Sequence, residues 1–511
     1  MNAPTQRGSA AGPAPRERVL LVGLASTLPP LRAAMEADPA GPVPVAECCV
    51  AGAGAGDPVG VARRAGATRA ILCLPASLGG RAARVGEALA AAGLPWVGVR
   101  PLREQLADAA DRPGAGELDL AALTDRAPRP LDEALLGPLL RGRRVLVTGA
   151  GGSIGAELCR VIAAWRPSVL HAVERSENAL FEVERELVRR FPGLPLAAVL
   201  HDVTQAERTH DLLQRLRPDL VVHAAAHKHV GMMEGHPAEA IENNLYGTRS
   251  VAAAADACGA DRFVMISTDK AVNPTSVMGA SKRLAERDVL GRDATSRTRM
   301  CTVRFGNVLG SACSVLPIWE DQLRRGGPLE VTDKRMLRYF MTIPEAAGLV
   351  LTAAALSGAS GPAGGRRGGE TFLLDMGEPV RIVDLAHRFL RQRGVEPGVD
   401  VAIRFTGARP GEKLFEELAH NADEVIPTAH PGIRVWRTAA VPASAQRATS
   451  RLDALRRRAG LAAPPWRGVS AAEAGAALRA AVPEMSGGAG GGAGAAQPVR
   501  LFAPPVHALA G

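Results

Sequence analysis

An acidic and a basic side chain stand next to each other in the stretch ISTDKAVNPTSVMGASKR, residues 266–283. The run FVMIST, which ends at Thr268, predicts a β-strand directly before Asp269 and Lys270. Open parallel sheets bind their ligands at the carboxyl ends of the strands, so we expect this pair to face a bound molecule. A surface turn ahead of the following Asn-Pro dipeptide is the alternative.

The two side chains can move protons in opposite directions. If both are buried, Asp269 can keep its proton and act as an acid, while Lys270 can stay neutral and act as a base. The reverse assignment stays open, as does a role for Asp269 in a further proton step. Thr268 is expected to orient the pair or to relay a proton. These residues predict acid–base chemistry on a bound substrate.

A glycine-rich turn, TGAGGSIG, follows a hydrophobic strand and opens a helix. Glycines at this spacing let the chain turn tightly and approach a pyrophosphate, while the helix N-terminus supplies amides and partial positive charge. An ordinary glycine turn is the alternative. The cofactor-binding residues predicted here are Gly149, Gly152, Ser153, Ile154 and Gly155.

A second predicted strand, SVLHAVE, ends at Glu174, where an acid can bind ribose hydroxyls. This position favours NAD. The next residue, Arg175, can instead receive a 2′-phosphate, so NADP remains open. The strand ends HDV and LVVHAAA support a dinucleotide site and add to its predicted residues, which are Ser176, Asp202, Val203, Ala224, Ala225 and Ala226.

With TGAGGSIG, HAAA, ENNLYGT and RFGNVLGS in this order, the chain resembles the extended short-chain dehydrogenase/reductase superfamily. TDKAVNPTSVMGASKR, RYFMTIPEAA, LLDMGEPVRIVDLA and ARPGEKLFEEL resemble, more narrowly, the UDP-N-acetylglucosamine-type 4,6-dehydratases of polysaccharide biosynthesis. The similarity is strong over about residues 131–433. It implies an α/β fold with a Rossmann-type doubly wound parallel sheet, preceded by a smaller Rossmann-like domain. It also implies tightly bound, recycled NAD or NADP and a UDP-sugar substrate.

The resemblance assigns roles to two residues on the helix after Lys270. In most of the superfamily a tyrosine precedes a lysine by four residues and accepts the substrate proton, whereas this chain has Met278 before Lys282. A thioether cannot accept a proton, so the acid and the base must be other residues. Lys282 is expected to hold the nicotinamide ribose; a solvated helical lysine is the alternative.

Further positions resemble the substrate-binding residues of this family, namely Lys228, Asn243, Asn307, Arg338, Arg409 and Lys413. For Asn243, a role as a helix-start cap is nearly as good an explanation. For Lys413, a salt bridge with Glu412 or Glu416 is the alternative. The HKH run around Lys228 suggests metal ligands, but a loop contacting cofactor or sugar is preferred and no metal site is predicted. Gly231 and the pair Ala312–Cys313 depart from the family pattern.

The predicted strands form two α/β units. The first turn of the leading unit, GLASTLPPL, lacks the glycines that admit a pyrophosphate, so that unit is expected to be non-catalytic. The predicted organisation is a disordered N-terminus (1–17), a Rossmann-like domain (18–102), a linker with a short helix (103–140), a catalytic domain with cofactor-binding and substrate-binding parts (141–435) and a largely disordered tail (436–511).

Composition limits the class of protein. Seven cysteines without CxxC spacing suggest neither a disulfide framework nor structural zinc, and they fit a reducing cytosol. No run reaches the roughly 18 apolar residues of a membrane span. The net charge of +9 comes without a basic run or an aromatic platform, so nucleic-acid binding is not expected. A basic surface suits anionic sugar nucleotides, or loose attachment to an acidic inner membrane face.

The resulting hypothesis is a cytoplasmic, homo-oligomeric nucleotide-sugar 4,6-dehydratase acting on a UDP-N-acetylhexosamine. Such a reaction needs one acid and one base beside the sugar, which Asp269 and Lys270 would supply. A UDP-sugar 4-epimerase is the nearest alternative, and Met278 disfavours it because that reaction ordinarily uses the missing tyrosine. A non-catalytic scaffold that binds nucleotides or nucleotide sugars is the alternative from a different class.

Overall fold

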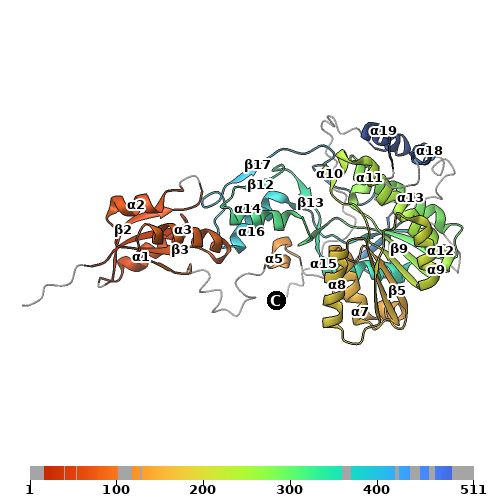
Figure 1. The fold of residues 1–511 in the computed structure, drawn as a ribbon, viewed down its shortest axis with the longest axis horizontal. Coiled ribbons are helices and arrows are strands. Elements are labelled where there is room, and N and C mark those ends of the chain that lie inside the picture. Colours follow the sequence, from red (N-terminus) through yellow and green to blue (C-terminus); the bar gives the residue numbers. More distant parts are fainter. Residues whose placement is uncertain are drawn as a thin grey trace, which may run out of the picture. The chain divides into compact units, whose positions relative to one another are not determined.

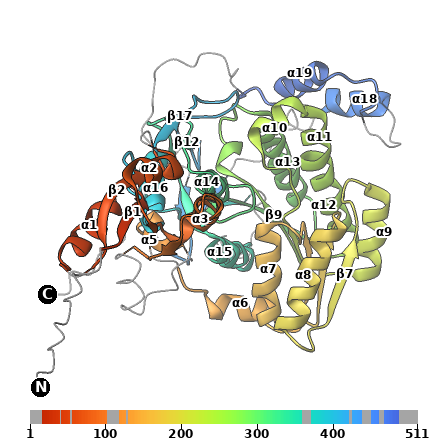
Figure 2. The same ribbon diagram turned by 60° about the vertical axis from the view of Figure 1, so that its left-hand side comes forward.

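The computed structural model describes residues 16–39, 41–52, 55–101, 118–126, 129–358, 370–420, 425–437, 449–459 and 466–485. The chain forms two compact units, drawn as ribbons in Figure 1 and Figure 2. The first contains Met1–Asp119, Leu316–Val331 and Val383–Thr406, and the second contains the remaining segments. The units are therefore interleaved along the chain. Within the described ranges, no helix is long and apolar enough to cross a membrane.

The first unit is built on a four-stranded parallel sheet in the order β2-β1-β3-β4. Its central strand is fully buried from Val19 to Val22, as the leucine-rich and valine-rich run predicts. This sheet and its helices confirm the expected smaller Rossmann-like α/β fold. The bounds are β1 Arg18–Gly23, α1 Leu28–Glu36, β2 Val43–Cys49, α2 Pro58–Ala65, β3 Arg69–Cys73, α3 Gly79–Ala91 and β4 Trp96–Gly98.

A carboxylate of the same unit fills the turn between β1 and α1. The backbone N–H of Ser26 donates to Asp400 over 3.1 Å, its hydroxyl donates to the other carboxylate oxygen, and Asp400 is fully buried. A helix N-terminus at this place is where α/β units commonly hold a phosphate. The contact supports the prediction that this unit has no catalytic role, which stays a prediction.

The second unit contains a nine-stranded sheet in the order β18-β19-β15-β10-β9-β8-β5-β6-β7. The strands from β15 to β7 are parallel, and β19 and β18 join in antiparallel fashion at one edge. The bounds are β5 Arg144–Thr148, β6 Val169–Glu174, β7 Leu196–Leu200, β8 Leu220–His223, β9 Arg262–Ile266, β10 Arg299–Arg304, β15 Glu370–Leu374, β18 Val425–Pro427 and β19 Ile433–Arg437.

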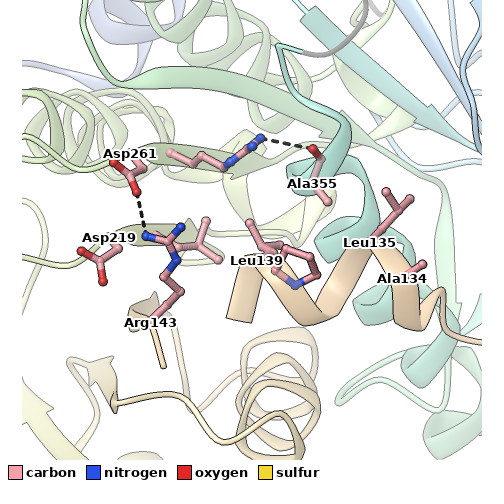
Figure 3. Close-up of a pocket in the computed structure, with 10 residues that line it drawn as sticks. Ala134, Leu135, Leu139, Arg143, Asp219, Asp261 and Ala355 are labelled. Atoms are coloured by element: carbon pink, nitrogen blue, oxygen red, sulfur yellow. Dashed lines mark hydrogen bonds and ion pairs between the residues drawn. The ribbon is translucent and has the colours of Figure 1, made fainter. Parts of the chain in front are cut away.

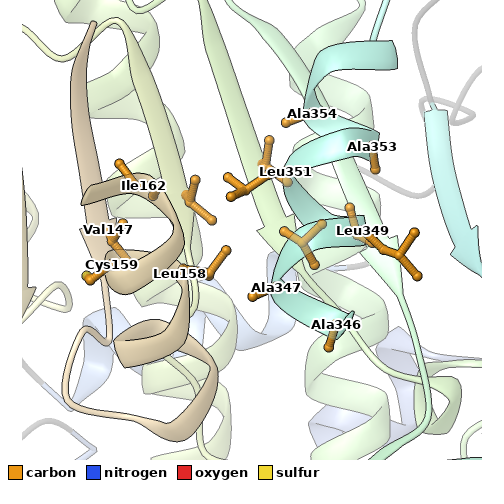
Figure 4. Packing of buried hydrophobic residues seen from close by; sticks show 14 of the residues in the cluster. Val147, Leu158, Cys159, Ile162, Ala346, Ala347, Leu349, Leu351, Ala353 and Ala354 are labelled. Carbon is orange, nitrogen blue, oxygen red and sulfur yellow. The ribbon is translucent and has the colours of Figure 1, made fainter. Parts of the chain in front are cut away.

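Helices cover both faces of this sheet, which confirms the doubly wound arrangement. One apolar core joins the sheet to α6 (Glu133–Leu140), α7 (Ser153–Ala164), α8 (Glu177–Arg190) and α15 (Ile343–Leu356). A second core joins it to α9 (Ala206–Leu216), α12 (Gly247–Cys258) and α13 (Val277–Asp293). Figure 4 shows Leu158 of α7 on the side that faces α15, where the small Ala347 of α15 lies. An alanine-rich core therefore packs through close helix approach.

The segment predicted as a linker contributes to this core. Residues 102–117 lie outside the described residues, but α5 (Leu120–Thr124) and α6 follow them. Leu136 and Leu140 of α6 are fully buried in the first core. The end of the expected linker is thus part of the second unit.

The expectation of a largely disordered tail after residue 435 is wrong for two segments. Helices α18 (Ser450–Arg458) and α19 (Ala471–Ala481) pack in an apolar cluster with α11 (Pro237–Ile241) and α13. Trp466 and Leu478 are buried in it. The alanine-rich composition suggested a disordered linker. Alanines can also be buried in a core, however, and here they form a small apolar helix face. The other residues of the tail from 438 on lie outside the described residues.

One buried carboxylate ties these helices to the unit. Glu242 accepts hydrogen bonds of 2.8 and 2.6 Å from the Arg456 guanidinium and of 3.0 Å from the Trp466 indole. Because a buried carboxylate without partners is costly, this pairing should hold α18 in place.

Replacing Arg456 tests this attachment. We expect Arg456→Gln to lower the free energy of unfolding by about 2–3 kcal/mol, since it leaves the Glu242 charge undercompensated. Arg458→Gln is the matched control on the same helix; its ion pair with Glu473 is exposed and should be worth less than about 1 kcal/mol. Urea denaturation followed by tryptophan fluorescence measures both, and equal losses would contradict the proposed attachment.

Candidate active site

The sequence-predicted acid and base meet at the carboxyl end of β9. Asp269 and Lys270 begin a short 3-10 turn, η3 (Asp269–Ala271), and Asp269 is fully buried. The Lys270 ammonium donates to Asp269 Oδ1 over 2.9 Å and to Asn307 Oδ1 over 3.1 Å. The Thr268 hydroxyl donates to the same aspartate oxygen over 2.9 Å. The arrangement is an ion pair fixed by two neighbouring polar groups.

Two glycines let the chain close around this pair. A Cβ on Gly279 would lie 2.2 Å from the Lys270 carbonyl oxygen, so only glycine lets α13 pack directly on η3. A Cβ on Gly306 would lie 3.0 Å from both Asp269 Oδ2 and the Tyr339 side chain. Gly306 precedes β11 (Asn307–Leu309), so the same close approach brings Asn307 to the ion pair.

A second buried carboxyl group lies in the same cluster. Glu416 Oε1 is 3.8 Å from the Arg338 guanidinium, and both side chains are buried. Burial raises the pKa of Glu416 and the charge of Asp269 adds to the rise, while Lys270, Arg338 and Lys413 lower that pKa. Among the described atoms, Glu416 Oε2 and Asp269 Oδ2 are buried without hydrogen-bond partners. The cluster therefore combines two carboxyl groups with three cations.

Arg338 and Lys413 also donate hydrogen bonds to backbone carbonyl oxygens. Arg338 donates to the Leu337, Lys413 and Leu414 carbonyl oxygens over 2.8–3.2 Å. Lys413 donates to the Val272 carbonyl over 2.7 Å and lies 3.5 Å from Glu417. The ion pair of Lys413 is thus with Glu417 rather than with Glu412 or Glu416. The substrate-binding roles of both residues stay predictions.

A tyrosine missed by the sequence analysis lies beside Asp269. The Tyr339 carbonyl oxygen accepts from the Asn307 N–H over 3.0 Å, where β14 (Phe340–Thr342) runs parallel to β11. Burial raises the pKa of Tyr339 to about 12, and Glu378 and Asp269 add to the rise. The phenol therefore stays protonated at neutral pH. The signal was available, because the chain has only two tyrosines and RYFMT contains one of them.

Met278 and Lys282, four residues apart on α13, have different surroundings. Met278 is buried in the apolar cluster shared with α18 and α19. Lys282 is also buried; desolvation lowers its pKa to about 8, against the opposing effect of Glu286. Packing thus explains Met278, while Lys282 keeps a titratable charge in the interior.

The glycine-rich turn fits a dinucleotide. Gly149 has φ +68°, and a Cβ there would lie 2.6 Å from the Ala225 nitrogen. A Cβ on Gly155 would lie 1.9 Å from the Gly149 carbonyl oxygen. Helix α7 begins after Gly152, and among the described residues no side chain caps its N-terminus. Its first amides are available to a diphosphate, and Ser153 Oγ, in the first turn of α7, accepts from the Ala312 N–H over 3.0 Å.

The two side chains predicted to bind the ribose, Glu174 and Arg175, lie at the end of β6. Glu174 accepts from the backbone N–H groups of Gly151, Arg175 and Ser176 over 2.9–3.1 Å. The Arg175 guanidinium lies 3.4 Å from Asn243 Oδ1 and 3.3 Å from a His227 ring nitrogen. This geometry leaves both NAD and NADP open.

The remaining predicted cofactor residues line neighbouring strand ends. Asp202 Oδ1 accepts from the Thr204 N–H and hydroxyl over 2.9 and 2.8 Å, and Val203 is buried. The Ala224–Ala226 segment follows β8, and the Ala224 N–H donates to the Thr148 carbonyl over 3.1 Å. These residues therefore lie at the same carboxyl edge as the glycine turn.

Asn244, which the sequence analysis did not select, connects two parts of the site. Its side chain bonds the His227 N–H over 2.8 Å, the His227 carbonyl over 3.0 Å and the Ser281 hydroxyl over 3.0 Å. Asn243 and Asn244 lie inside a π-helical turn, η2 (Glu242–Tyr246), so Asn243 is no helix-start cap. Such turns are rare and often occur at functional sites.

Two predicted substrate residues lie at loops. Lys228 donates to the Ala312 carbonyl over 2.8 Å, beside Cys313 with φ +55°. Arg409 is exposed, and its side chain is 3.9 Å from a Cβ built on Gly231. Both departures from the family pattern thus lie next to predicted substrate residues. The described residues contain no group of three or more His, Cys, Asp or Glu placed for a metal ion.

A pocket at the opposite edge of the sheet is separate from this site. Arg143, Asp219 and Asp261 line it where β5, β8 and β9 begin, together with Leu139 of α6 (Figure 3). Arg143 and Asp261 form an ion pair of 3.2 Å within it. The predicted residues lie at the carboxyl edge, so this pocket is not their site.

Comparison with known proteins identifies a family for this chain. The family model described as "Polysaccharide biosynthesis protein" matches residues 145–438. The probable polysaccharide biosynthesis protein EpsC of Bacillus subtilis (strain 168) is 46% identical over 315 residues, which are 61% of this chain and 51% of that protein. The chain thus spans about half the length of that relative.

Shorter relatives include two kinds of enzyme. A UDP-N-acetylglucosamine 4,6-dehydratase (inverting) of Campylobacter jejuni (strain 81-176) is 29% identical over 294 residues, 56% of this chain and 80% of that protein. A UDP-glucose 4-epimerase of Rickettsia typhi is 34% identical over 289 residues, 55% of this chain and 79% of that protein.

A solved structure shares the fold. The X-ray structure of Pen from Bacillus thuringiensis has a TM-score of 0.53 and 30% identity, and the match covers 58% of this chain and 89% of that one. With the family match over more than half of its length, the chain belongs to the polysaccharide biosynthesis protein family, within the extended short-chain dehydrogenase/reductase superfamily.

Proposed function

We propose that this protein is a nucleotide-sugar 4,6-dehydratase that converts a UDP-N-acetylhexosamine, with UDP-N-acetylglucosamine as the first candidate, to the 4-keto-6-deoxy sugar. The observation that carries the proposal is the ion pair between the fully buried Asp269 and Lys270, whose side chain is 19% exposed, at the carboxyl end of β9. Dehydration needs an acid and a base on neighbouring sugar carbons. The Campylobacter dehydratase among the relatives supports the same reaction.

NAD or NADP is the cofactor of this proposal. The turn from Gly149 to Gly155 and the first amides of α7 would hold its diphosphate, and Glu174 or Arg175 would meet the ribose that carries adenine. Lys282 would lie at the nicotinamide ribose. When bound, the cofactor supplies a hydride acceptor for C4 of the sugar and later returns that hydride to C6.

The chain's own residues handle the protons. Asp269, as a carboxylate, takes the proton of the C4 hydroxyl, and as an acid it then delivers that proton to the departing C6 hydroxyl, which leaves as water. Lys270, as a free amine, removes the proton from C5, which the neighbouring ketone has acidified, and returns it there after the hydride arrives. Thr268 and Asn307 orient the pair through the hydrogen bonds that they make to it.

A UDP-sugar 4-epimerase is the second candidate, because a Rickettsia relative carries that name. Epimerisation needs one residue that removes and returns the C4 proton and needs no acid for a leaving group. The buried Met278 cannot serve as that residue, and the presence of both Asp269 and Lys270 favours dehydration. Product mass separates the two reactions, because only dehydration removes water.

Asp269→Asn tests the proposed acid. We expect the rate of 4-keto product formation from UDP-N-acetylglucosamine to fall by about 10²–10⁴-fold, because an amide neither accepts nor delivers the proton. Mass spectrometry and proton NMR of the product measure it. Asp261→Asn is the matched control at the other end of β9, where its side chain is 63% exposed, and it should keep wild-type activity. Unchanged product formation by Asp269→Asn would remove Asp269 from the mechanism.

The charge of Lys282 should also appear in protein stability. Its pKa is about 8 in the folded protein and ordinarily 10.5, so between these pH values the unfolded chain binds more protons. The free energy of unfolding should therefore rise with pH across this window, by at most about 3 kcal/mol. Denaturant titrations of dinucleotide-free protein should show this rise relative to Lys282→Met, which has no such group. Parallel pH curves for the two proteins would contradict a buried, titrating Lys282.

A further inference from the structure

The turn between η3 and α13, which follows the proposed acid and base, is bonded to a distant segment of the same unit. The Val272 carbonyl accepts from the Lys413 ammonium over 2.7 Å. Further along the turn, the Thr275 hydroxyl donates to the Gly411 carbonyl over 2.9 Å. These two bonds attach both ends of the turn to the segment 411–420.

Asn273 lies at the centre of this turn, in an unusual backbone conformation. Its φ is +39°, which is left-handed and uncommon for residues with a side chain, although asparagine adopts it more readily than most. Two side-chain contacts fix Asn273 in this conformation. His420 Nδ1 lies 2.9 Å from Asn273 Oδ1, and Asn273 Nδ2 donates to Glu417 Oε2 over 3.3 Å. The direction in which the chain leaves η3 therefore depends on contacts with the segment 411–420.

The pattern of donors and acceptors leaves one orientation for the Asn273 amide. An ionised Glu417 only accepts hydrogen bonds, so the NH2 group of Asn273 must face it and the amide oxygen must face His420. His420 Nδ1 then carries the proton and donates it. Burial lowers the pKa of His420 to about 4, and Arg283 and Arg304 add to this effect, so the ring is neutral at neutral pH. The imidazole thus donates to the amide, and the amide donates to the carboxylate.

We propose that Asn273 is a positioning residue whose two bonds to the segment 411–420 set the place of the Asp269–Lys270 pair. The Val272 N–H donates to the Asp269 carbonyl over 3.0 Å, so a shift of the turn moves the backbone of the pair directly. Asn273 itself takes no proton. The inference rests on the proposed function, because it concerns the proton transfers that the pair is proposed to perform.

The segment 411–420 also connects this turn to the predicted substrate contacts. Lys413 lies within the segment and Arg409 just precedes it, and both are predicted to bind the substrate. The bonds of Asn273 therefore join the groups proposed to move protons to the part of the chain expected to hold the nucleotide. Such a link matters, because a misplacement of about 1 Å can lower a rate by about 10²-fold.

Exchanging the amide and the carboxylate tests this role. Asn273→Asp places a second carboxylate against Glu417, whereas Glu417→Gln keeps an acceptor oxygen for the asparagine amide. In the double variant Asn273→Asp/Glu417→Gln, the glutamine amide can donate to the introduced carboxylate, which can also accept from His420. Both bonds are then restored, with the donor and the acceptor of one of them reversed.

Turnover of UDP-N-acetylglucosamine by the full-length proteins, with their bound dinucleotide, gives the readout. We expect kcat for the 4-keto product to fall by about 10²-fold in Asn273→Asp, because the pair is displaced. KM should change by less than about threefold, since the residues predicted to hold the nucleotide are intact. The double variant should recover kcat to within about fivefold of wild type, and Glu417→Gln alone should lose less than about fivefold.

Asn273→Gly separates the side chain from the backbone. Glycine adopts the left-handed conformation freely but makes neither side-chain bond. A loss of kcat similar to that of Asn273→Asp supports the role of the side chain, and wild-type kcat in Asn273→Gly would overturn it. If Asn273→Asp does not fold, Asn273→Gly and the double variant decide the question, because the inference requires low kcat in the first and near wild-type kcat in the second.

The outcomes distinguish this inference from the proposed function. Unchanged kcat in Asn273→Asp would overturn the role of Asn273, and so would a double variant that is no more active than Asn273→Asp. A lower melting temperature with unchanged kcat per folded protein would show a merely structural role and would overturn it as well. Each of these results leaves the dehydratase proposal standing when the wild-type protein is active. A wild-type protein that forms no 4-keto product from any UDP-N-acetylhexosamine would overturn both.

Discussion

The burial of charge at the carboxyl edge of the large sheet is the constraint on which the site depends. Asp269 has no exposed surface, so its carboxylate is tolerable only because Lys270 and Thr268 bind it. The same low-dielectric surroundings make proton transfer between neighbours sensitive to each added charge. Glu416 and Tyr339 lie in this field, and the pKa of each is raised. The stability of this edge and the proposed chemistry therefore depend on the same set of contacts.

Helix α13 packs against other parts of the second unit on two sides. On the side of η3, Gly279 allows direct contact with the Lys270 backbone. On the other side, Met278 joins the apolar cluster of α18 and α19. Glu286, four residues after Lys282 on α13, is fully buried and forms an ion pair of 2.6 Å with the fully buried Arg304. These contacts hold α13, and with it Lys282, in one position. The amphipathic pattern of the helix sequence does not predict that this lysine is buried.

The turn between the first strand and the first helix is built differently in the two α/β units. In the second unit, Gly149 after β5 lies so close to the backbone of Ala225 that no side chain fits between them. In the first unit, Asp400 fills the corresponding turn and bonds Ser26. In the first unit the anion at the start of the helix is part of the protein, whereas the proposed function gives the second unit the diphosphate of a bound cofactor. The turn GLASTLPPL has a single glycine, Gly23, where TGAGGSIG has four, and this is consistent with the difference.

The sequence by itself determined the parallel sheets, the glycine turn and the Asp269–Lys270 pair, because strand periodicity and short motifs are local properties of the chain. It missed Tyr339 and Asn244, and it did not predict helices α18 and α19. These depend on contacts between segments far apart in the chain, such as Asn244 bonded to Ser281 or Trp466 bonded to Glu242. Only the tertiary structure decides them, because burial and electrostatic neighbours arise when distant segments pack together.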